Sequence, residues 1–295
     1  MDGVTTTAAS RARIAGSSRL EARTRRFLGR VLLGFSVVVI LSPAVFVLFW
    51  MLSLAFKNEL DNTAYPPVFI PTAPTLANFQ TVFKNSPFFQ YTINSVIVSG
   101  SATIIAILAG VPAGYGIAKA KATGLAVLVM IARMTPGLSF LLPLFMLFRF
   151  IGINGSLLSL VITHMVITLP VVVWVMIGFY EDIHPELEEA ALIDGCNVWQ
   201  AFLRVAMPLS KPGIAVSGIL AFIFSWNNFL FGAVLAGKAT RTLPVAVYNS
   251  LTFEQISWGP LAASALIVTL PALLLTIFFQ RHIVTGLAAG GIKGG

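Results

Sequence analysis

The sequence predicts an all-α membrane protein with six transmembrane helices, both termini in the cytoplasm, and a polar cytoplasmic loop between helices four and five. The first observation is composition: 57% of the 295 residues are hydrophobic and only 10% are charged, whereas a soluble domain carries about 25% charged residues. The second is that the apolar residues form six long runs. Each run can cross the membrane as a helix, because about 20 apolar residues in a helix span the hydrocarbon core. The third is that basic residues collect at the ends of these runs, as in membrane topology control.

This pattern divides the chain into three parts. Residues 1–30 form a basic cytoplasmic segment, residues 31–280 form the transmembrane domain with its polar loop at 181–212, and residues 281–295 form a cytoplasmic tail. Pro136 and Pro143 are expected to break the third helix, because proline removes a backbone hydrogen bond. The expected spans are 31–56, about 91–116, 124–148, 157–179, 213–236 and 260–280.

The first apolar run is expected to be a retained transmembrane helix and not a signal peptide. It contains 26 residues, Val31 to Phe56, whereas the apolar part of a signal peptide has about 7–15. The polar residues KNELDN follow it, with no small-residue cleavage site. The rest of segment 57–90 contains YPPVFIPTAP and is expected to be extended or turn-like, because proline disfavours helix.

The basic residues predict the orientation. Six spans place both termini on one side of the membrane. With the N-terminus inside, thirteen of the 19 Lys and Arg residues lie inside, five lie outside and Arg133 lies within the third span. This asymmetry favours cytoplasmic termini. The net charge of +8 does not indicate nucleic-acid binding, because seven arginines between Arg11 and Arg30 directly precede the first run.

Catalytic, metal and nucleotide sites are not expected in this chain. Cys196 is the single cysteine, which excludes an intramolecular disulfide, and the three histidines are too scattered for a metal site. The stretch Gly232-AVLA-Gly237-Lys238-Ala239 has the spacing of a phosphate-binding loop. It lacks the final hydroxyl and the strand–loop–helix context that such a loop needs. We therefore expect no enzyme activity and no cofactor in this chain.

The sequence fits two other classes of membrane protein poorly. An intramembrane protease needs paired acids, a nucleophile with a base, or a metal, and no acid lies in any expected span. A secondary transporter usually carries buried ionisable groups for ion coupling, so it fits poorly. A six-span channel or secondary transporter for a small polar solute, without ATPase coupling, is kept as the alternative function.

The polar loop at 181–212 is expected to form two short helices on the cytoplasmic membrane face. Pro185 suits the first turn of a helix, and the acids after it suit the positive end of the helix dipole. Gly195 can take positive φ and end this helix. A second helix over about 197–205 is expected next, and Pro208 and Pro212 are expected to end it and lead into the fifth span at 213–236.

This loop matches the spacing E-A-A-x3-G-x9-I-x-L-P and resembles the coupling-helix motif of permease subunits in bacterial ABC importers. Val205 and Met207 replace the Ile and Leu of the pattern, and both keep an apolar side chain. The stretches PTLANFQTVF, NSVIVS, SWNNFLFG, RTLPVAV and GLAAGGIKG resemble the carbohydrate-uptake branch of these permeases, near the maltose-transporter inner subunits; only residues 1–30 lack a counterpart. The matching positions, with Asp194 between them, are Glu189, Ala190, Ala191, Gly195, Val205, Met207 and Pro208.

The resemblance implies a function and a set of partners. It implies a permease subunit of the bacterial inner membrane that forms half of the path of a sugar, polyol or charged sugar derivative. A related permease would complete the path, an extracytoplasmic binding protein would deliver the solute, and the loop would dock on one of two copies of a cytoplasmic ATPase. ATP and Mg would be bound by those ATPase subunits. The glycine-rich C-terminal tail would run along the ATPase, or be a frayed end.

Candidate residues for the solute path lie in three spans. Arg133 lies roughly 14 Å into the third span, at 1.5 Å per residue, and would either contact solute or cap the broken helix before Pro136. Asn227 and Asn228 offer amides for sugar hydroxyls, and Trp226 offers a stacking face; the alternative for the asparagines is hydrogen bonding between helices. His164 is a further candidate, although interhelical hydrogen bonding is its commoner role.

Overall fold

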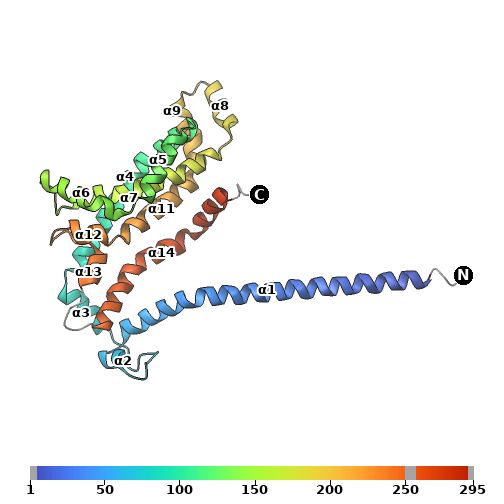
Figure 1. The fold of residues 1–295 in the computed structure, drawn as a ribbon, viewed down its shortest axis with the longest axis horizontal. Helices are drawn as coiled ribbons and strands as arrows, with labels where there is room; N and C mark the ends of the chain where they lie inside the picture. The colour runs from blue at the N-terminus through green and yellow to red at the C-terminus, as the bar shows by residue number, and fades with distance from the viewer. Residues whose placement is uncertain (1–4, 250–256, 292–295) are drawn as a thin grey trace. The chain divides into compact units, whose positions relative to one another are not determined.

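In the computed structural model, the backbone is described for residues 5–249 and 257–291, and within these ranges the chain is helical (Figure 1). The chain divides into two compact units, Met1–Ser53 and Leu54–Gly295, which are described separately. Within the described ranges, six membrane spans result if each of two bent helix pairs counts as one span: Thr123–Met134 with Gly137–Phe150, and Val198–Leu209 with Lys211–Trp226. The exact six spans and the cytoplasmic termini stay predictions. Among the described residues, four single helices are long and apolar enough to cross a membrane: Gly29–Phe56, Phe88–Lys119, Leu157–Glu181 and Trp258–Phe278.

The first unit holds all but the last three residues of the long helix α1 (Thr5–Phe56), which contains the expected first span. Pro43 lies inside this helix without ending it. The side chains from Val31 to Phe49 are exposed, as expected for an apolar helix whose solvent is lipid. The arginine side chains from Arg11 to Arg26 lie outside the part of the chain whose side chains the structure describes.

Three helices form the centre of the second unit: α4 (Phe88–Lys119), α7 (Leu157–Glu181) and α11 (Lys211–Trp226). α4 packs along α7, and α11 packs against both. The last long helix, α14 (Trp258–Gly291), packs against α11. The second, fourth and sixth expected spans are therefore confirmed as helices; α4 and α7 extend at most three residues beyond the expected limits, and α14 continues from the expected end at 280 to Gly291.

Two glycines allow α4 to approach α7 closely. A Cβ atom added at Gly110 would lie 2.8 Å from Cγ1 of Val172, and one added at Gly114 would lie 2.8 Å from Cβ of Met176. The glycines are four residues apart and so lie on one face of α4. This is the small-residue packing that brings helix backbones together in membranes.

The expected third span is two helices, α5 (Thr123–Met134) and α6 (Gly137–Phe150), bent by 87° at the break between them. The predicted break at Pro136 is confirmed, because the residue before proline is pushed to extended backbone and Thr135 has φ −64° and ψ 126°. The predicted break at Pro143 is wrong. Pro143 lies inside α6, since the loss of one backbone hydrogen bond is tolerated in a packed membrane helix.

The expectation of one continuous fifth helix over 213–236 is wrong. α11 ends at Trp226, and a short helix, α12 (Leu230–Leu235), follows after three residues. The Asn227 side chain donates to a carbonyl in the last turn of α11 at 3.1 Å, and the Asn228 side-chain oxygen accepts from a backbone N–H of α12 at 3.0 Å. Short amides that bond to the local backbone end helices in this way.

Three short helices lie in the connections between spans, two of them within segment 57–90, which was expected to be extended or turn-like. They are α2 (Glu59–Thr63), α3 (Ala77–Asn85) and α13 (Leu243–Asn249). The extended structure expected for 57–90 therefore holds only between these helices. The side chain of Asn58 accepts from a backbone N–H of α2 at 2.7 Å, an N-cap that the proline-based expectation overlooked.

Polar residues near the start of α4 hold the connection between α12 and α13. The Nδ2 atom of Asn94 donates to the carbonyls of Ala239 and Arg241, both at 2.9 Å, and Asn94 is buried. The Oγ atom of Ser95 accepts from the backbone N–H of Leu243 at 2.7 Å. These bonds satisfy buried polar groups and fix one end of the second unit, away from the loop described next.

Candidate functional site

Residues 181–212 form the expected loop of two short helices after α7. The first, α8 (Pro185–Ile193), has Pro185 in its first turn, and the second begins as α9 (Val198–Ala201) with a capping box. Gly195 lies between them with φ +89°, the left-handed conformation that ends helices. The two helices and the positive φ of Gly195 are thus confirmed. Figure 1 places α8 and α9 together at one end of the second unit.

The second helix of the loop is longer than expected. α9 passes through a π-helical turn (Phe202–Ala206) into α10 (Met207–Leu209), so Pro208 lies inside this helix and does not end it. The N–H of Met207 bonds to the carbonyl of Phe202, five residues earlier. This wider turn accommodates a proline that would otherwise clash with the preceding turn. Pro212 lies in the first turn of α11, as expected.

The loop presents apolar side chains to its surroundings. Ile193 and Val198, on either side of the turn at Gly195, are 86% and 64% exposed. Exposed apolar groups with polar neighbours are typical of a protein interface; we call the exposed residues from Leu187 to Trp199 the docking surface. Of the motif residues, Glu189, Ala190, Asp194, Gly195 and Pro208 are exposed, and Ala191, Val205 and Met207 are partly buried.

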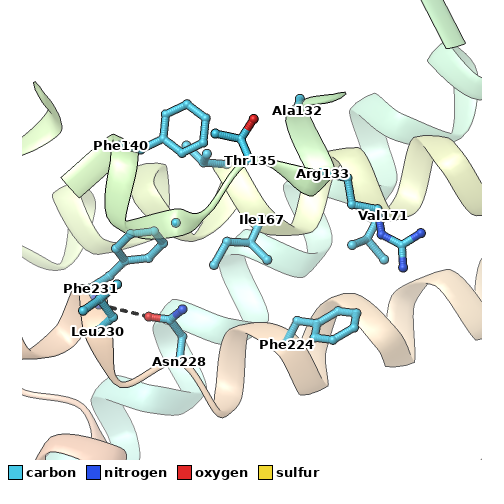
Figure 2. Close-up of a pocket in the computed structure, with 12 residues that line it drawn as sticks. Ala132, Arg133, Thr135, Phe140, Ile167, Val171, Phe224, Asn228, Leu230 and Phe231 are labelled. Carbon is cyan, nitrogen blue, oxygen red and sulfur yellow. Dashed lines mark hydrogen bonds between the residues drawn. The ribbon is translucent and has the colours of Figure 1, made fainter. Parts of the chain in front are cut away.

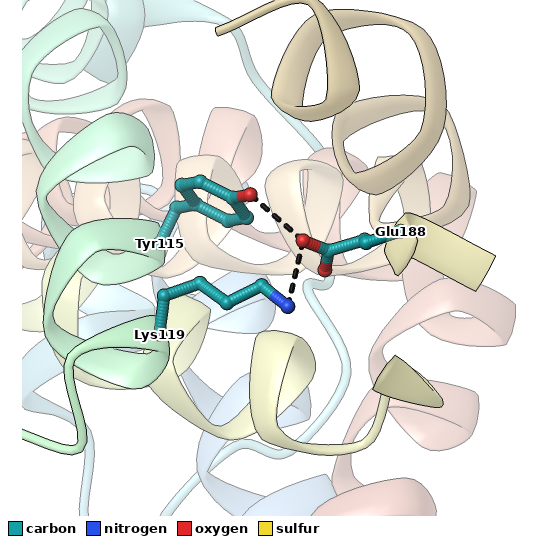
Figure 3. A network of polar contacts seen from close by, with 3 residues as sticks. All are labelled: Tyr115, Lys119 and Glu188. Atoms are coloured by element: carbon teal, nitrogen blue, oxygen red, sulfur yellow. Dashed lines mark hydrogen bonds and ion pairs between the residues drawn. The ribbon is translucent and has the colours of Figure 1, made fainter. Parts of the chain in front are cut away.

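Glu188, next to the motif glutamate, connects the loop to the end of α4 (Figure 3). Its Oε2 atom accepts a hydrogen bond from the Tyr115 hydroxyl at 2.8 Å and lies 2.7 Å from Nζ of Lys119. Glu188 is buried, whereas Glu189 is exposed. Sequence reasoning singled out Glu189 and missed this contact. The available signal was Tyr115 and Lys119, four residues apart on one face at the end of a span.

Aromatic rings join both halves of the loop to α4 and α7. The Tyr115 ring lies 5.3 Å from that of Tyr180, near the end of α7, and 4.8 Å from that of Phe202 in the π-helical turn. Phe202 also contacts Trp199, with ring centroids 5.1 Å apart. Tilted pairs at these distances are favourable. The docking surface therefore rests on a packed aromatic cluster and is not a free loop.

A second candidate site is a cavity of about 310 Å³ between the two helix breaks (Figure 2). The end of α5, the start of α6, the middle of α7, the end of α11 and the start of α12 all line it. Broken backbone within a membrane is tolerated where it lines a cavity or is buried in protein. Its aromatic walls are Phe140, Phe224 and Phe231.

The cavity brings together two of the predicted solute-path residues. Arg133 and Asn228 both line it, although they are far apart in sequence, and Figure 2 shows them on α5 and at the break after α11. No carboxylate of the described residues lies within ion-pair distance of Arg133. Thr135, also in the lining, donates its hydroxyl hydrogen to the carbonyl of Ile131 at 2.8 Å. The cavity thus offers hydrogen-bond donors between aromatic rings.

The other three predicted path residues do not line this cavity. Trp226 is buried and donates its indole N–H to the carbonyl of Val268 in α14 at 3.0 Å, so its ring offers no open stacking face. Asn227 closes α11 as described above. His164 is buried, and its Nδ1 atom lies 2.7 Å from Oγ of Ser225, so it links α7 to α11.

The glycine-rich stretch with phosphate-loop spacing lies in a different context. Gly232 is within α12, and Gly237 lies in a turn where its N–H donates to Oγ1 of Thr240 at 2.8 Å. A helix precedes the turn, whereas a phosphate-binding loop follows a strand. Across the described ranges, no three His, Cys, Asp or Glu side chains lie close enough to hold a metal ion.

Comparison with known proteins places these features in a family. Residues 102–288 match the family described as "Binding-protein-dependent transport system inner membrane component". This match covers more than half of the chain, from the middle of α4 through the loop and the docking surface into α14.

Individual relatives and one solved structure agree with this match. The sulfoquinovosyl glycerol transport system permease protein SmoH of Agrobacterium fabrum is 34% identical over 272 residues, which are 91% of this chain and 95% of SmoH. The trehalose transport system permease protein SugB of Mycobacterium tuberculosis is 34% identical over 263 residues, 87% of this chain and 95% of SugB. A chain of a bacterial ABC transporter involved in the import of the acidic polysaccharide alginate has the same fold, with TM-score 0.70, 19% identity, and coverage of 88% of this chain and 97% of that chain.

Proposed function

The chain belongs to the family of binding-protein-dependent transport system inner membrane components, a multi-pass protein of the inner membrane, and from this premise we propose that it is a permease subunit of an ATP-driven sugar importer. It forms half of a solute path, and a related permease forms the other half. An extracytoplasmic binding protein delivers the solute. The energy comes from two copies of a cytoplasmic ATPase, which bind ATP and Mg.

The observation that carries this proposal is the docking surface. Ile193 and Val198 are exposed apolar side chains on either side of the turn at Gly195, and such exposed apolar groups mark interaction sites. The acids Glu189 and Asp194 flank these apolar groups and suit a basic rim on the ATPase. Because the loop also packs on α4 and α7, movement imposed on the docking surface reaches the membrane helices.

The proposed topology has six spans, with the loop and both termini in the cytoplasm. The bent pair α5–α6 forms one span. We pair α11 with α12 as another span, instead of with the loop helix Val198–Leu209 that precedes it, and both of these spans are broken near the cavity. The tail begins within α14, which is helical as far as Gly291; Lys293 lies outside the described residues. We propose that this tail runs along the ATPase.

The proposed solute is a sugar or a sugar derivative. SmoH and SugB are described as permeases for sulfoquinovosyl glycerol and for trehalose, so relatives of equal identity serve a sulfonated and a neutral solute. The importer, reconstituted in liposomes with its partner subunits and binding protein, is tested with both of these solutes and with maltose. ATP-dependent accumulation of a sugar supports the proposal. Equal uptake without ATP would contradict it and favour a channel.

Arg133→Met is expected to weaken solute handling in this assay. The variant removes the guanidinium from the cavity and keeps an unbranched side chain, and losing a hydrogen bond to a charged donor raises the KM of uptake about ten-fold. Asn228→Ala is expected to raise KM about three-fold, because a neutral hydrogen bond is weaker. The measurement is initial uptake rate against concentration of the best accumulated sugar.

Arg149→Met provides the matched control. Arg149 is exposed in the last turn of α6 and does not line the cavity, so its loss should leave KM unchanged. If the Arg133 and Arg149 variants have the same KM as the unaltered chain, the cavity is not on the solute path.

A further inference from the structure

Glu188 places a buried carboxylate between two helices that are not neighbours in the chain. The Tyr115 hydroxyl donates to its Oε2 atom at 2.8 Å, and Nζ of Lys119 lies 2.7 Å from the same oxygen (Figure 3). The side chain of Glu188 is 6% exposed, and that of Lys119 is 41% exposed. The cation is thus partly in water, while the carboxylate depends on the protein for its polar contacts.

This arrangement resists separation of α8 from α4. If α8 moved away, the buried carboxylate would lose both partners, and an unpaired buried charge is strongly unfavourable. The helix ends add to the attraction, because Lys119 lies in the last turn of α4 and Glu188 lies near the start of α8. Each charge is at the helix end that favours its sign.

The contact matters because the loop has no covalent connection to α4. The chain joins the loop only to α7 and α11, so a force on the docking surface reaches α4 through side-chain contacts. α4 packs along α7 through Gly110 and Gly114 and also contacts α11. It is therefore central in the bundle that must rearrange during transport.

We propose that Glu188, held by Tyr115 and Lys119, is the positioning residue that makes α8 and α4 move as one body. Its task is to pass the movement of the docking surface to α4. The inference rests on the proposed function, because it needs a motor on that surface. The simpler reading, that the contact only stabilises the loop, makes a different prediction for the ratio of transport to ATP hydrolysis.

The test uses Glu188→Gln and Lys119→Met in the complete importer in liposomes. Glu188→Gln keeps the size of the side chain and an acceptor for Tyr115, but it removes the charge. ATP hydrolysis stimulated by the binding protein is expected to persist in both variants, while solute transported per ATP falls about ten-fold, because α8 can then move without α4 and a typical coupling free energy between sites is lost. Exchanging the charges, Glu188→Lys with Lys119→Glu, is expected to restore most of the lost ratio.

Two matched controls carry the same substitutions at exposed positions. Glu186→Gln lies on α8 in its first turn, and Lys121→Met lies just after α4. Neither residue contacts the Glu188 carboxylate in the contacts of the described chain. Both controls should keep the unaltered ratio of solute to ATP.

The outcomes separate this inference from the proposed function. A lower thermal midpoint with an unchanged ratio in both variants would overturn the positioning role, because the contact would then be only structural. Should Glu188→Gln fail to fold, Lys119→Met decides alone, since its side chain is partly exposed. ATPase docking is checked in the same samples by protection of Cys196 from thiol reagents. Lack of protection in the unaltered chain would overturn the proposed function itself.

Discussion

Gly195→Asp is expected to lower solute uptake about ten-fold or more while the chain still inserts in the membrane. A Cβ at Gly195 would meet no other atom of this chain within 4 Å, so the variant does not disturb packing inside the subunit. It adds a carboxylate to the turn between the exposed Ile193 and Val198, at the centre of the docking surface. Uptake and ATP hydrolysis should therefore become uncoupled. Glu189→Lys, which reverses a charge beside the same surface, should act in the same direction.

The control for backbone strain is Gly152→Asp. Gly152 also has positive φ, +78°, and open space around its Cβ position, and it lies between α6 and α7, away from the loop. Both aspartates therefore carry a similar backbone cost of about 1–2 kcal/mol. Uptake is measured in cells with the amount of chain in the membrane determined in parallel. Equal loss in both variants, or normal uptake in Gly195→Asp, would argue against docking at this turn.

Gly114→Val is expected to disrupt the packing of α4 on α7. The added Cβ would lie 2.8 Å from Cβ of Met176 and 3.2 Å from the carbonyl oxygen of Val173. The second of these atoms is backbone and cannot move aside without shifting α7. Overpacking of this kind costs about 1–3 kcal/mol or more. The measurement is the thermal unfolding midpoint of the purified chain in detergent, which should fall by several degrees.

Gly116→Val is the matched control for this variant. Gly116 is on the same helix, two residues later, and a Cβ there meets nothing within 4 Å. The cost of placing valine in a helix is therefore shared by the two variants. If both have the same midpoint, the close approach of α4 to α7 does not contribute to stability.

Local chemistry made much of this fold predictable. The long apolar runs predicted the main helices, because the length of a span is set by the bilayer. Pro185 and Gly195 predicted where α8 begins and ends, because proline and glycine act through their own backbone geometry. The break before Pro136 followed from the same kind of rule.

The errors concern properties that depend on neighbours. Whether Pro143 or Pro208 breaks a helix depends on the turn around it, and a run as apolar as 213–236 hides the capping by Asn227. Side-chain direction was also out of reach. Trp226 packs on α14. Glu188 rather than Glu189 faces α4, and the sequence alone does not show which of two adjacent side chains on a helix faces a neighbouring helix.

The juxtaposition in the cavity was only partly predictable. Arg133 was singled out because a charge deep in a span is costly and needs a polar partner or water. Asn228 was singled out for its amide. That both line one cavity depends on the two helix breaks facing each other across α7, and no local rule predicts this.

The most direct test of the central claim uses the single cysteine of the chain. Cys196 follows Gly195, between residues of the docking surface, and is partly exposed. A membrane-impermeant maleimide is applied to inside-out and right-side-out vesicles, with and without the ATPase subunits, and the modified Cys196 peptide is quantified by mass spectrometry. The expected result is modification only in inside-out vesicles, slowed about ten-fold or more by the bound ATPase. Modification in right-side-out vesicles, or equal rates with and without the ATPase, would contradict the claim that a cytoplasmic motor sits on this loop.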